Sequence, residues 1–518
     1  MGNKIYPIGI QNFESLRLDG YFYIDKTALI YQLVKSGRYY FLSRPRRFGK
    51  SLLISTLEAY FQGKKELFQG LAMEKLEKDW TKYPILHIDL NTQKYDSPQS
   101  LESKLNRTLV TWEKLYGSEP AEDSLSMRFE GTIQRAYEQT GQRVVILVDE
   151  YDKPMLQAIG NKELQNSFRE TLKAFYGALK SKDGCIKFAM LTGVTKFGKV
   201  SVFSDLNNLD DISMWNEYIE LCGISEKEIH KNLETELHEF ADVQKMTYDS
   251  FCEKLRQYYD GYHFTHNSIG MYNPFSLLNA FKRKEFGSYW FETGTPTYLV
   301  ELLKRHHYNL ERMAHEETNA QVLNSIDSES TSPIPVIYQS GYLTIKGYDE
   351  EFGIYHLGFP NKEVEEGFIQ FLVPYYTSMN NVESPFEIQK FVREIRSGDY
   401  NSFFQRLQSF FADTTYEIIR EQELHYENVL FIIFKLVGFY VKVEYHTSRG
   451  RIDLVLQTDK FIYIMEFKLN GTAEEALQQI NDKNYALPFE MDGRKLFKIG
   501  VNFSAETRNI EKWIVEEK

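Results

Sequence analysis

Short apolar runs alternate with amphipathic stretches between residues 39 and 224. The apolar runs are nearly continuous, which is typical of strands that are buried on both faces of a sheet. The stretches between them carry apolar residues at helical spacing. This order predicts a mostly parallel sheet with helices on both faces, a three-layer α/β/α domain. The predicted strands are 39–43, 84–90, 143–150 and 186–194, and the predicted helices are 51–61, 100–117 and 163–180.

After residue 224 the pattern becomes helical, with aromatic-rich turns. Residues 334–368 predict a helix end, a strand pair around a turn at 347–353, and a helix that opens at Asn361. That order is typical of a winged-helix module, although three-helix and hairpin modules of other functions share it. The serine-rich run 325–333 is the expected flexible connector.

A third pattern follows residue 384, where helices precede a set of short strands. The predicted strands are 440–448, 451–457, 461–469 and 495–503, with helices near 424–437 and over 472–486. This α-β-β-β-α-β order fits a domain of about 130 residues. We therefore expect three domains, which comprise residues 1–224, 225–383 and 384–518.

The composition supports packed domains in a reducing environment. Of the 518 residues 42% are hydrophobic, with 37 Phe and 35 Tyr, so disordered and low-complexity classes are excluded. Cys185, Cys222 and Cys252 form no CxxC pair, which argues against a zinc knuckle and against a disulfide framework. A cytoplasmic protein is expected.

The apolar stretches argue against a membrane partner, and the net charge restricts how nucleic acid could bind. The longest apolar stretch, 429–441, is interrupted by Lys435 and is shorter than the roughly 20 residues that a bilayer crossing needs. It predicts a buried core helix, and neither a membrane span nor a targeting signal is expected. The net charge is −12, and from Tyr440 onward 12 Lys and Arg stand against 13 Asp and Glu. Any nucleic-acid site must therefore be local.

A candidate phosphate-binding loop, SRPRRFGKS, occupies residues 43–51 between a predicted strand and a predicted helix. N–H groups at a helix N-terminus attract phosphate, a lysine can reach the β- and γ-phosphates, and the next hydroxyl can bind Mg²⁺. Gly49, Lys50 and Ser51 are assigned to those roles. Arg44 replaces the first glycine of the usual GxxxxGK[ST] pattern. For Lys50 alone, a solvated lysine at a helix start is the alternative.

Two carboxylates end the predicted strand 143–150. Ligands of parallel sheets bind at the carboxyl ends of the strands, where carboxylates can meet Mg²⁺ and an attacking water. Asp149 is the predicted metal ligand and Glu150 the residue that polarises the water. A solvated strand end is the alternative, but the phosphate-binding loop on the expected strand and helix weighs against it.

Three further residues are candidates for phosphate contact. Thr192 ends the strand 186–194 and could sense the γ-phosphate, with capping of the turn as the alternative. Arg46 and Arg47 lie in the loop and could bind phosphate, although arginines beside a proline are commonly solvated.

The last domain carries a second candidate site on two adjacent strands. Asp453 lies in strand 451–457, and Glu466 and Lys468 lie two residues apart in strand 461–469. Alternation places the latter two on one face, and a hairpin brings Asp453 opposite or diagonal to them. Two carboxylates, Asp453 and Glu466, can chelate Mg²⁺ or Mn²⁺, and a lysine can activate a water. A surface ion pair is the alternative, but unpaired charges in such apolar strands are costly.

The chain resembles a known family in six segments that cover most of its length. They are YFYIDKTALI (21–30), FLSRPRRFGKSLLISTL (41–57), VVILVDEYDKPM (144–155), LTGVTKFGKVSVFSDLNNL (191–209), YYDGYHF (258–264) and YNPFSLLNAF (272–281). They look like the bacterial AAA-ATPase-like proteins that carry a C-terminal PD-(D/E)XK nuclease-type domain. In that family the arginine also replaces the first glycine of the loop.

The resemblance extends to the last domain, where GRID followed by MEFK is similar to the PD-(D/E)XK core. It implies that Gln479, which shares a helix face with Lys483, is the helix glutamine of such nucleases. Glu427 on the preceding helix could supply another carboxylate, with an exposed helix charge as the alternative.

These features predict an ATP- and Mg²⁺-dependent protein that cleaves phosphodiester bonds of nucleic acid, with DNA as the expected partner. ATP hydrolysis would control the assembly of a homo-oligomer or access to the substrate. The alternative is a nucleotide-dependent switch whose nuclease-like domain binds nucleic acid or protein without cleaving it.

Overall fold

The computed structural model describes most of the chain. The described residues are 4–196, 202–203, 206, 208–291, 297–324, 332–377, 384–412, 422–438, 440, 442–448, 451–469, 471–489, 491–504, 506–507 and 509–517. Residues 325–331 of the expected serine-rich connector lie outside these ranges. Among the helices in this part of the chain, none combines the length and the apolar character that a membrane crossing requires.

The chain forms two compact units. The first comprises Met1–Thr293 and His315–Glu363, and the second comprises Gly294–Ala314 and Val364–Lys518. The boundary expected near residue 224 falls inside the first unit, and the division into three domains stays a prediction.

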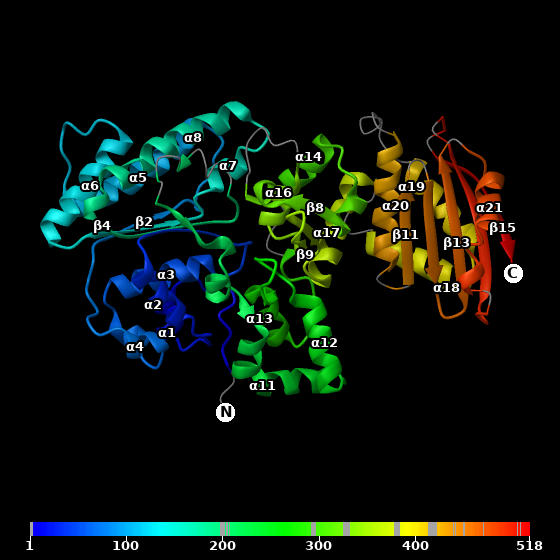
Figure 1. Ribbon diagram of the computed structural model, residues 1–518, viewed down its shortest axis with the longest axis horizontal. Coiled ribbons are helices and arrows are strands. Elements are labelled where there is room, and N and C mark those ends of the chain that lie inside the picture. Colours follow the sequence, from blue (N-terminus) through cyan, green and yellow to red (C-terminus); the bar gives the residue numbers. More distant parts are fainter. Residues whose placement is uncertain are drawn as a thin grey trace. The chain divides into compact units, whose positions relative to one another are not determined.

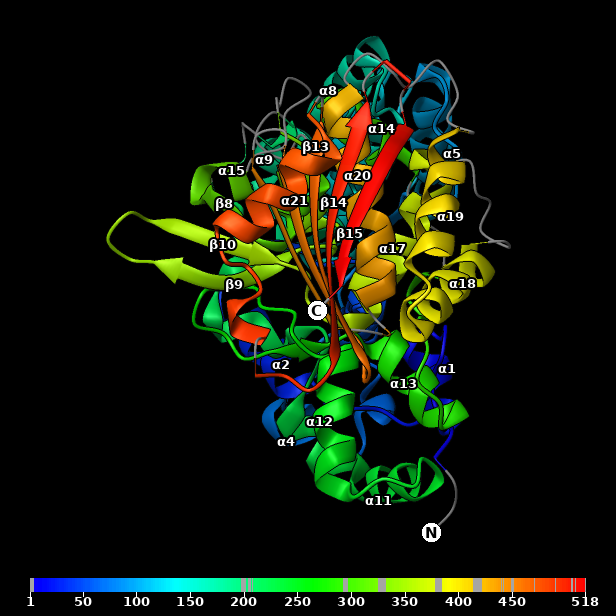
Figure 2. The same cartoon turned by 90° about the vertical axis from the view of Figure 1, so that its right-hand side faces the viewer.

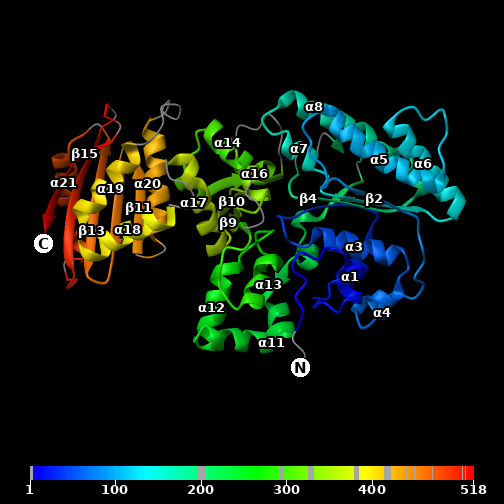
Figure 3. The same ribbon diagram turned by 180° about the vertical axis from the view of Figure 1, so that it is seen from behind.

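A five-stranded parallel sheet forms the centre of the first unit, with the strand order β2-β3-β4-β1-β5. Strand β3 is buried along its whole length, as its continuous apolar run predicted. Helices α5, α6 and α8 cover one face and α1, α2 and α3 cover the other, as Figures 1 and 3 show (Figure 1, Figure 3). The expected mixed α/β fold with a three-layer α/β/α arrangement is therefore confirmed.

The bounds in this region agree with the predicted strands to within one or two residues. The strands are β1 Tyr39–Ser43, β2 Ile85–Asp89, β3 Val144–Asp149, β4 Ile186–Gly193 and β5 Asp210–Asp211. The helices are α1 Phe13–Leu18, α2 Thr27–Ser36, α3 Lys50–Phe61, α4 Ala72–Leu76, α5 Pro98–Tyr116, α6 Leu125–Thr140, α7 Lys153–Gln157, α8 Lys162–Tyr176 and α9 Ala178–Ser181. The 3₁₀ turns are η1 Lys65–Phe68, η2 Asp183–Cys185, η3 Ile212–Met214 and η4 Asn216–Leu221. Among the helices that cover the sheet, α1, α2 and α6 were not predicted.

The rest of the first unit is mainly helical. An apolar core that includes Leu233, Phe240, Phe251 and Phe281 holds α11, α12 and α13 together. The predicted strand pair is present as β9 and β10, which are antiparallel and extended by β8. The winged-helix assignment stays a prediction. The elements are β6 Ile224–Ser225, α11 Glu226–Val243, α12 Tyr248–Tyr259, β7 Met271–Tyr272, α13 Pro274–Arg283, β8 Glu316–Asn319, α15 Ala320–Asn324, α16 Ile334–Gln339, β9 Thr344–Asp349 and β10 Ile354–Gly358.

The second unit contains a five-stranded sheet in the order β11-β12-β13-β14-β15. Its pairs are antiparallel except β13 with β14, which α21 connects as a parallel crossover. Helix α21 lies on one face of the sheet, and α18, α19 and α20 lie on the other (Figure 2). The predicted α-β-β-β-α-β order is present, and the stretch 429–437 is a buried part of α20, as expected.

Strand β15, which lies at the edge of the sheet, was not predicted, because its sequence NIEKWIVEE lacks a strict alternation of apolar and polar residues. The strands of this unit are β11 Lys442–Ser448, β12 Arg451–Gln457, β13 Phe461–Leu469, β14 Lys495–Ser504 and β15 Asn509–Glu517. Its helices are α14 Thr297–Arg305, η6 Leu310–Ala314, α17 Lys362–Tyr376, which begins at the end of the first unit, α18 Ser384–Ser397, α19 Tyr400–Ala412, α20 Gln422–Gly438, α21 Ala473–Asp482 and η8 Leu487–Phe489.

Candidate functional site

The predicted phosphate-binding loop joins β1 to α3 through a left-handed turn. Gly49 caps the N-terminus of α3 with a φ of +95°, and Arg47 has a φ of +66°. Glycine tolerates such a backbone because it lacks a Cβ atom. The turn leaves the first N–H groups of α3, from Lys50 onward, at the carboxyl edge of the sheet, where anions are attracted.

Arg44, which replaces the first glycine of the loop, is a buried anchor and does not line the cavity described below. Its Nη1 atom donates to the carbonyl oxygens of Ser43 and Ser213 at 2.9 and 2.7 Å, and its guanidinium lies 4.0 Å from the ring centre of Phe264. Burial lowers the pKa of Arg44 to about 10. The carbonyl of Arg44 accepts a 3.0 Å hydrogen bond from Lys50 Nζ, which also donates to Pro45 O at 3.2 Å. The lysine is therefore already held within the loop.

The strand-end carboxylates lie beside this loop. Asp149 is buried, and its Oδ1 accepts a 2.6 Å hydrogen bond from Thr192 Oγ1. Thr192 thus contacts Asp149, not the cavity. Glu150 has a φ of +53°, a conformation that is rare for a residue with a side chain. Burial raises the pKa of Glu150, and the cations Lys50 and Lys153 oppose that rise.

The phosphate-binding loop and Glu150 line a cavity of about 310 Å³, and neither Asp149 nor Thr192 is among its lining residues. Six predicted site residues line it, namely Arg46, Arg47, Gly49, Lys50, Ser51 and Glu150. Asn91 and Lys153 also line it and were missed, as were residues 7–11, Pro274, Phe275 and Leu278. Asn91 could have been found from the sequence, because it follows the predicted strand 84–90 at the edge where the carboxylates were expected.

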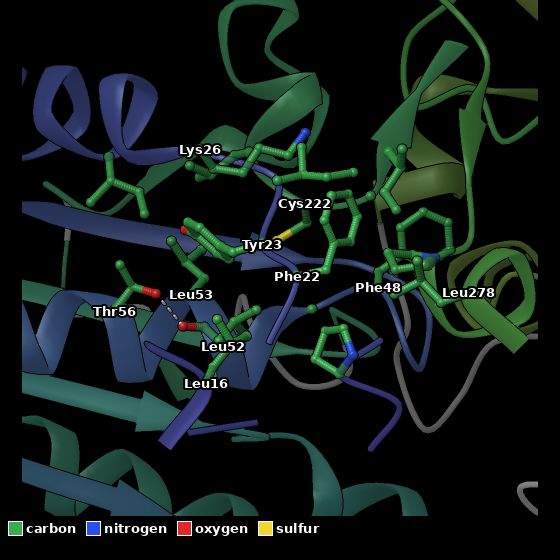
Figure 4. A pocket seen from close by; sticks show the side chains of 18 residues that line it. Leu16, Phe22, Tyr23, Lys26, Phe48, Leu52, Leu53, Thr56, Cys222 and Leu278 are labelled. Atoms are coloured by element: carbon green, nitrogen blue, oxygen red, sulfur yellow. Dashed lines mark hydrogen bonds between the residues drawn. The ribbon is translucent and has the colours of Figure 1, made fainter. Parts of the chain in front are cut away.

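An apolar pocket of about 100 Å³ adjoins the cavity and shares Pro7, Gly49, Leu52, Pro274 and Leu278 with it. Figure 4 shows Phe22, Phe48 and Leu53 around this pocket, with the Lys26 ammonium group at its rim (Figure 4). Lys26 Nζ forms an ion pair with Glu228 at 2.6 Å. The cavity thus carries the cations and the hydroxyl of Ser51, and the adjoining pocket carries mainly apolar surface.

In the second unit the hairpin has the predicted pairing. Asp453 of β12 is directly opposite Glu466 of β13, and Arg451 is opposite Lys468. The side chain of Asp453 lies outside the described residues. Glu466 is fully buried, with 0% exposure. Among the described residues, no group of three His, Cys, Asp or Glu side chains is arranged to hold a metal ion.

Helix α21 brings its polar face to the end of this hairpin. Lys468, Gln479 and Lys483 line one open groove with the acidic residues of α21. Gly500 of β14 is opposite Glu466, and a Cβ atom there would overlap with the backbone of Ala473 and Leu477. The glycine therefore lets α21 approach the sheet. Glu427 does not line the groove, and its carboxylate accepts a 3.4 Å hydrogen bond from Asn309.

The fold and these two regions define a P-loop protein with an additional nuclease-like unit, and the comparisons agree. Residues 7–203 match the family described as predicted AAA-ATPase, and residues 421–513 match the PD-(D/E)XK nuclease superfamily. A protein of Azotobacter chroococcum, named as an uncharacterized protein in the vnfD 5' region, is 35% identical over 532 residues, which cover 100% of this chain and 99% of that protein. The chain belongs to this family of AAA-ATPase-like proteins with a C-terminal PD-(D/E)XK nuclease-type domain.

One solved structure was also similar. The ORC2 protein of Aeropyrum pernix, determined as ADPNP and ADP complexes, has 12% identity and a TM-score of 0.24, over 70% of this chain and 92% of that chain.

Proposed function

We propose that the first unit binds and hydrolyses ATP and that the second cleaves phosphodiester bonds of nucleic acid, with DNA as the expected substrate. The convergence of Lys50, Ser51 and Glu150 on one cavity supports the ATPase assignment. The phosphates of ATP would lie among the cations of the cavity, against the N-terminus of α3. The nucleobase would occupy the adjoining apolar pocket.

Ser51 and Asp149 carry oxygen donors of the kind that a magnesium ion prefers, and they would hold that ion. Ser51 offers a hydroxyl, and the Asp149 carboxylate retains lone pairs beyond the one that accepts from Thr192. A bound Mg²⁺ would neutralise phosphate charge. Glu150 would accept the proton of the attacking water, and its raised pKa favours that role because the carboxylate is a stronger base.

For the nuclease, the support is the pairing of Asp453 with Glu466 and the groove that holds Lys468 and Gln479. Asp453 and Glu466 would hold Mg²⁺ or Mn²⁺, and Lys468 would activate the water, with Gln479 positioning it. The nearly balanced charge of this region predicts weak non-specific binding. A homo-oligomer would supply additional binding surface.

A second candidate function is a nucleotide-dependent switch whose nuclease-like unit binds without cleaving. Its support is that two side chains and one backbone N–H group outside the sheet donate hydrogen bonds to the phosphate-binding loop. Asn273 Nδ2 and Trp290 Nε1 donate to the carbonyl oxygen of Arg46 at 3.2 and 3.1 Å, and Gly223 N donates to Phe48 O at 3.1 Å. A nucleotide that shifts the loop would disturb these contacts and so affect the helices α11 to α13.

The two candidates are separated by measuring phosphate release and the cleavage of single-stranded DNA, duplex DNA and RNA, with and without ATP and Mg²⁺. We expect Glu150→Gln to bind ATP without hydrolysing it, and Asp453→Ala to hydrolyse ATP without cleaving. A wild-type protein that hydrolyses ATP, binds nucleic acid in an ATP-dependent way and never cleaves it would support the switch. Wild-type hydrolysis by Glu150→Gln would contradict the assigned base.

A further inference from the structure

The turn after β3 comprises residues 150–153. Its two middle residues, Tyr151 and Asp152, contact buried parts of the first unit. Tyr151 N donates to Thr192 O at 3.0 Å, and the buried Tyr151 ring packs edge-on against Phe41 at 5.3 Å between centroids. The Asp152 carboxylate accepts hydrogen bonds from Val194 N at 3.2 Å, Thr195 N at 2.6 Å and Thr195 Oγ1 at 2.7 Å. Tyr151 and Asp152 therefore bind the turn to the end of β4 and to the two residues that follow this strand.

The other two residues of the turn, Glu150 and Lys153, line the cavity. Glu150 adopts a left-handed backbone, and its carbonyl accepts a 3.1 Å hydrogen bond from Lys153 N, which begins α7. The contacts of Tyr151 and Asp152 thus fix the turn, and the turn places the carboxylate of Glu150 and the ammonium group of Lys153 in the lining of the same cavity. Rigid support of this kind holds reacting groups in position.

Lys153 differs from Lys50, the other lysine of the cavity. Lys50 Nζ donates to two loop carbonyls. Within the described ranges, the ammonium group of Lys153 makes no hydrogen bond or ion pair, although the side chain is only partly exposed. It shares the cavity with Ser51 and Glu150 and is therefore free to contact an anion between them.

We propose that Lys153 is a further catalytic residue of the ATPase, which contacts the γ-phosphate and stabilises its transition state. The inference rests on the proposed ATPase function. In the reaction the water oxygen forms a bond to the γ-phosphorus, the bond from that phosphorus to the bridging oxygen of ADP breaks, and Glu150 accepts the proton of the water. Negative charge on the γ-phosphoryl oxygens and the leaving oxygen would face the ammonium group. A cation supplied within the chain needs no partner subunit for this step.

The test compares Lys153→Ala and Lys153→Arg with the wild type, and uses Lys162→Ala, an exposed lysine of α8 outside the cavity, as the matched control. We expect kcat for Lys153→Ala to fall by about 100-fold or more, by analogy with other charge-stabilising groups. Affinity for ADP should stay within about threefold, since the contact forms mainly with the γ-phosphoryl group. Affinity for ADP with aluminium fluoride, which mimics the transition state, should fall at least about tenfold. Lys153→Arg should recover part of the loss in kcat and part of the loss in affinity for ADP with aluminium fluoride.

The outcomes also separate this inference from the function on which it rests. No ATP hydrolysis by the wild type would overturn both. An active wild type with an equally active Lys153→Ala would overturn the role of Lys153 and leave the ATPase intact. A loss of ADP and ADP–aluminium fluoride affinity to the same extent would also overturn it, because a structural or uniform binding role would then explain the defect.

Discussion

The two candidate sites are built in different ways. Residues that line the nucleotide cavity come from five places in the chain, between Pro7 and Leu278. The candidate residues of the nuclease-like unit lie within one hairpin and one following helix, between Asp453 and Gln479. The first site therefore depends on long-range packing, and the second depends mainly on the register of two strands and on how closely one helix approaches them.

The difference is also electrostatic. The nucleotide cavity is lined by four cations and one carboxylate, which favour a highly charged anion; they are Arg46, Arg47, Lys50, Lys153 and Glu150. The second site has the buried carboxyl group of Glu466 in an apolar sheet and a mixed-charge groove beside it. The cations of the first site would bind the phosphates of ATP together with Mg²⁺, whereas at the second site a metal ion would have to supply most of the positive charge.

The largest expected effect comes from Lys50→Ala. Removing the ammonium group that the loop holds ready for the phosphates should weaken ATP binding by about 100-fold or more. Calorimetric titration with a non-hydrolysable ATP analogue measures this. Lys65→Ala, an exposed lysine of η1, is the control and should bind normally. Metal binding in the second unit should not change, and a binding loss below threefold in Lys50→Ala would disprove the assignment of the loop.

Substitutions in the hairpin should separate the role of Glu466 in metal binding from the role of Lys468 in water activation. Glu466→Gln keeps the buried shape but removes the charge, so Mn²⁺ affinity should fall about tenfold and cleavage should be lost. Lys468→Ala should keep Mn²⁺ affinity, since its ammonium repels the cation, yet cleavage should also fall about 100-fold. Calorimetry with Mn²⁺ and a cleavage assay check both variants, and ATP hydrolysis should be normal in each. Unchanged Mn²⁺ affinity in Glu466→Gln would make the hairpin a structural ion-pair cluster.

Gly500→Ala tests whether the close approach of α21 matters to the second site. The added methyl group would meet the backbone of Ala473 and Leu477, so we expect the second unit to lose roughly 2–3 kcal/mol of stability through overpacking. Cleavage should decline because α21 also carries Gln479. In Gly493→Ala the new methyl group meets no atom within 4 Å, which makes it the matched control. Urea unfolding followed together with cleavage measures the effect, and equal stability of the two variants would contradict the packing argument.

The smallest effect is expected at Glu77 of the first unit, away from both sites. Burial alone would raise the pKa of Glu77, but hydrogen bonds from Tyr60, Lys35 and the backbone lower it to about 2. A depressed pKa stabilises the folded state above the unfolded value of 4.5, and this contribution is lost as the pH falls toward 2.

Glu77→Gln should therefore lower the free energy of unfolding by about 1–2 kcal/mol at pH 7, with a smaller difference at pH 3. Denaturant unfolding at the two pH values measures this, and ATP hydrolysis at pH 7 should be unchanged. A difference that grows toward low pH would have the wrong sign for a carboxylate that is stabilised in its charged form.

The sequence determined the elements that carry both sites. Apolar runs and helical spacing predicted β1 to β4, because burial on both faces of a sheet selects residues locally. The hairpin of Asp453 and Glu466 was also predictable, since strand alternation and a short turn largely specify register. The order of strand, Gly49, Lys50 and Ser51, and helix located the phosphate-binding loop for the same local reason.

Only the tertiary structure decided which side chains share a cavity. It buried Arg44 between segments about 170 and 220 residues away, placed Thr192 on Asp149, and brought Asn91 and Lys153 beside Lys50. It also made Gly500 a contact point for α21. The spacing of apolar residues along a helix or strand predicts which of its residues are buried. The neighbours of a buried residue across the sheet depend on strand order and on packing between distant segments, which no local pattern encodes.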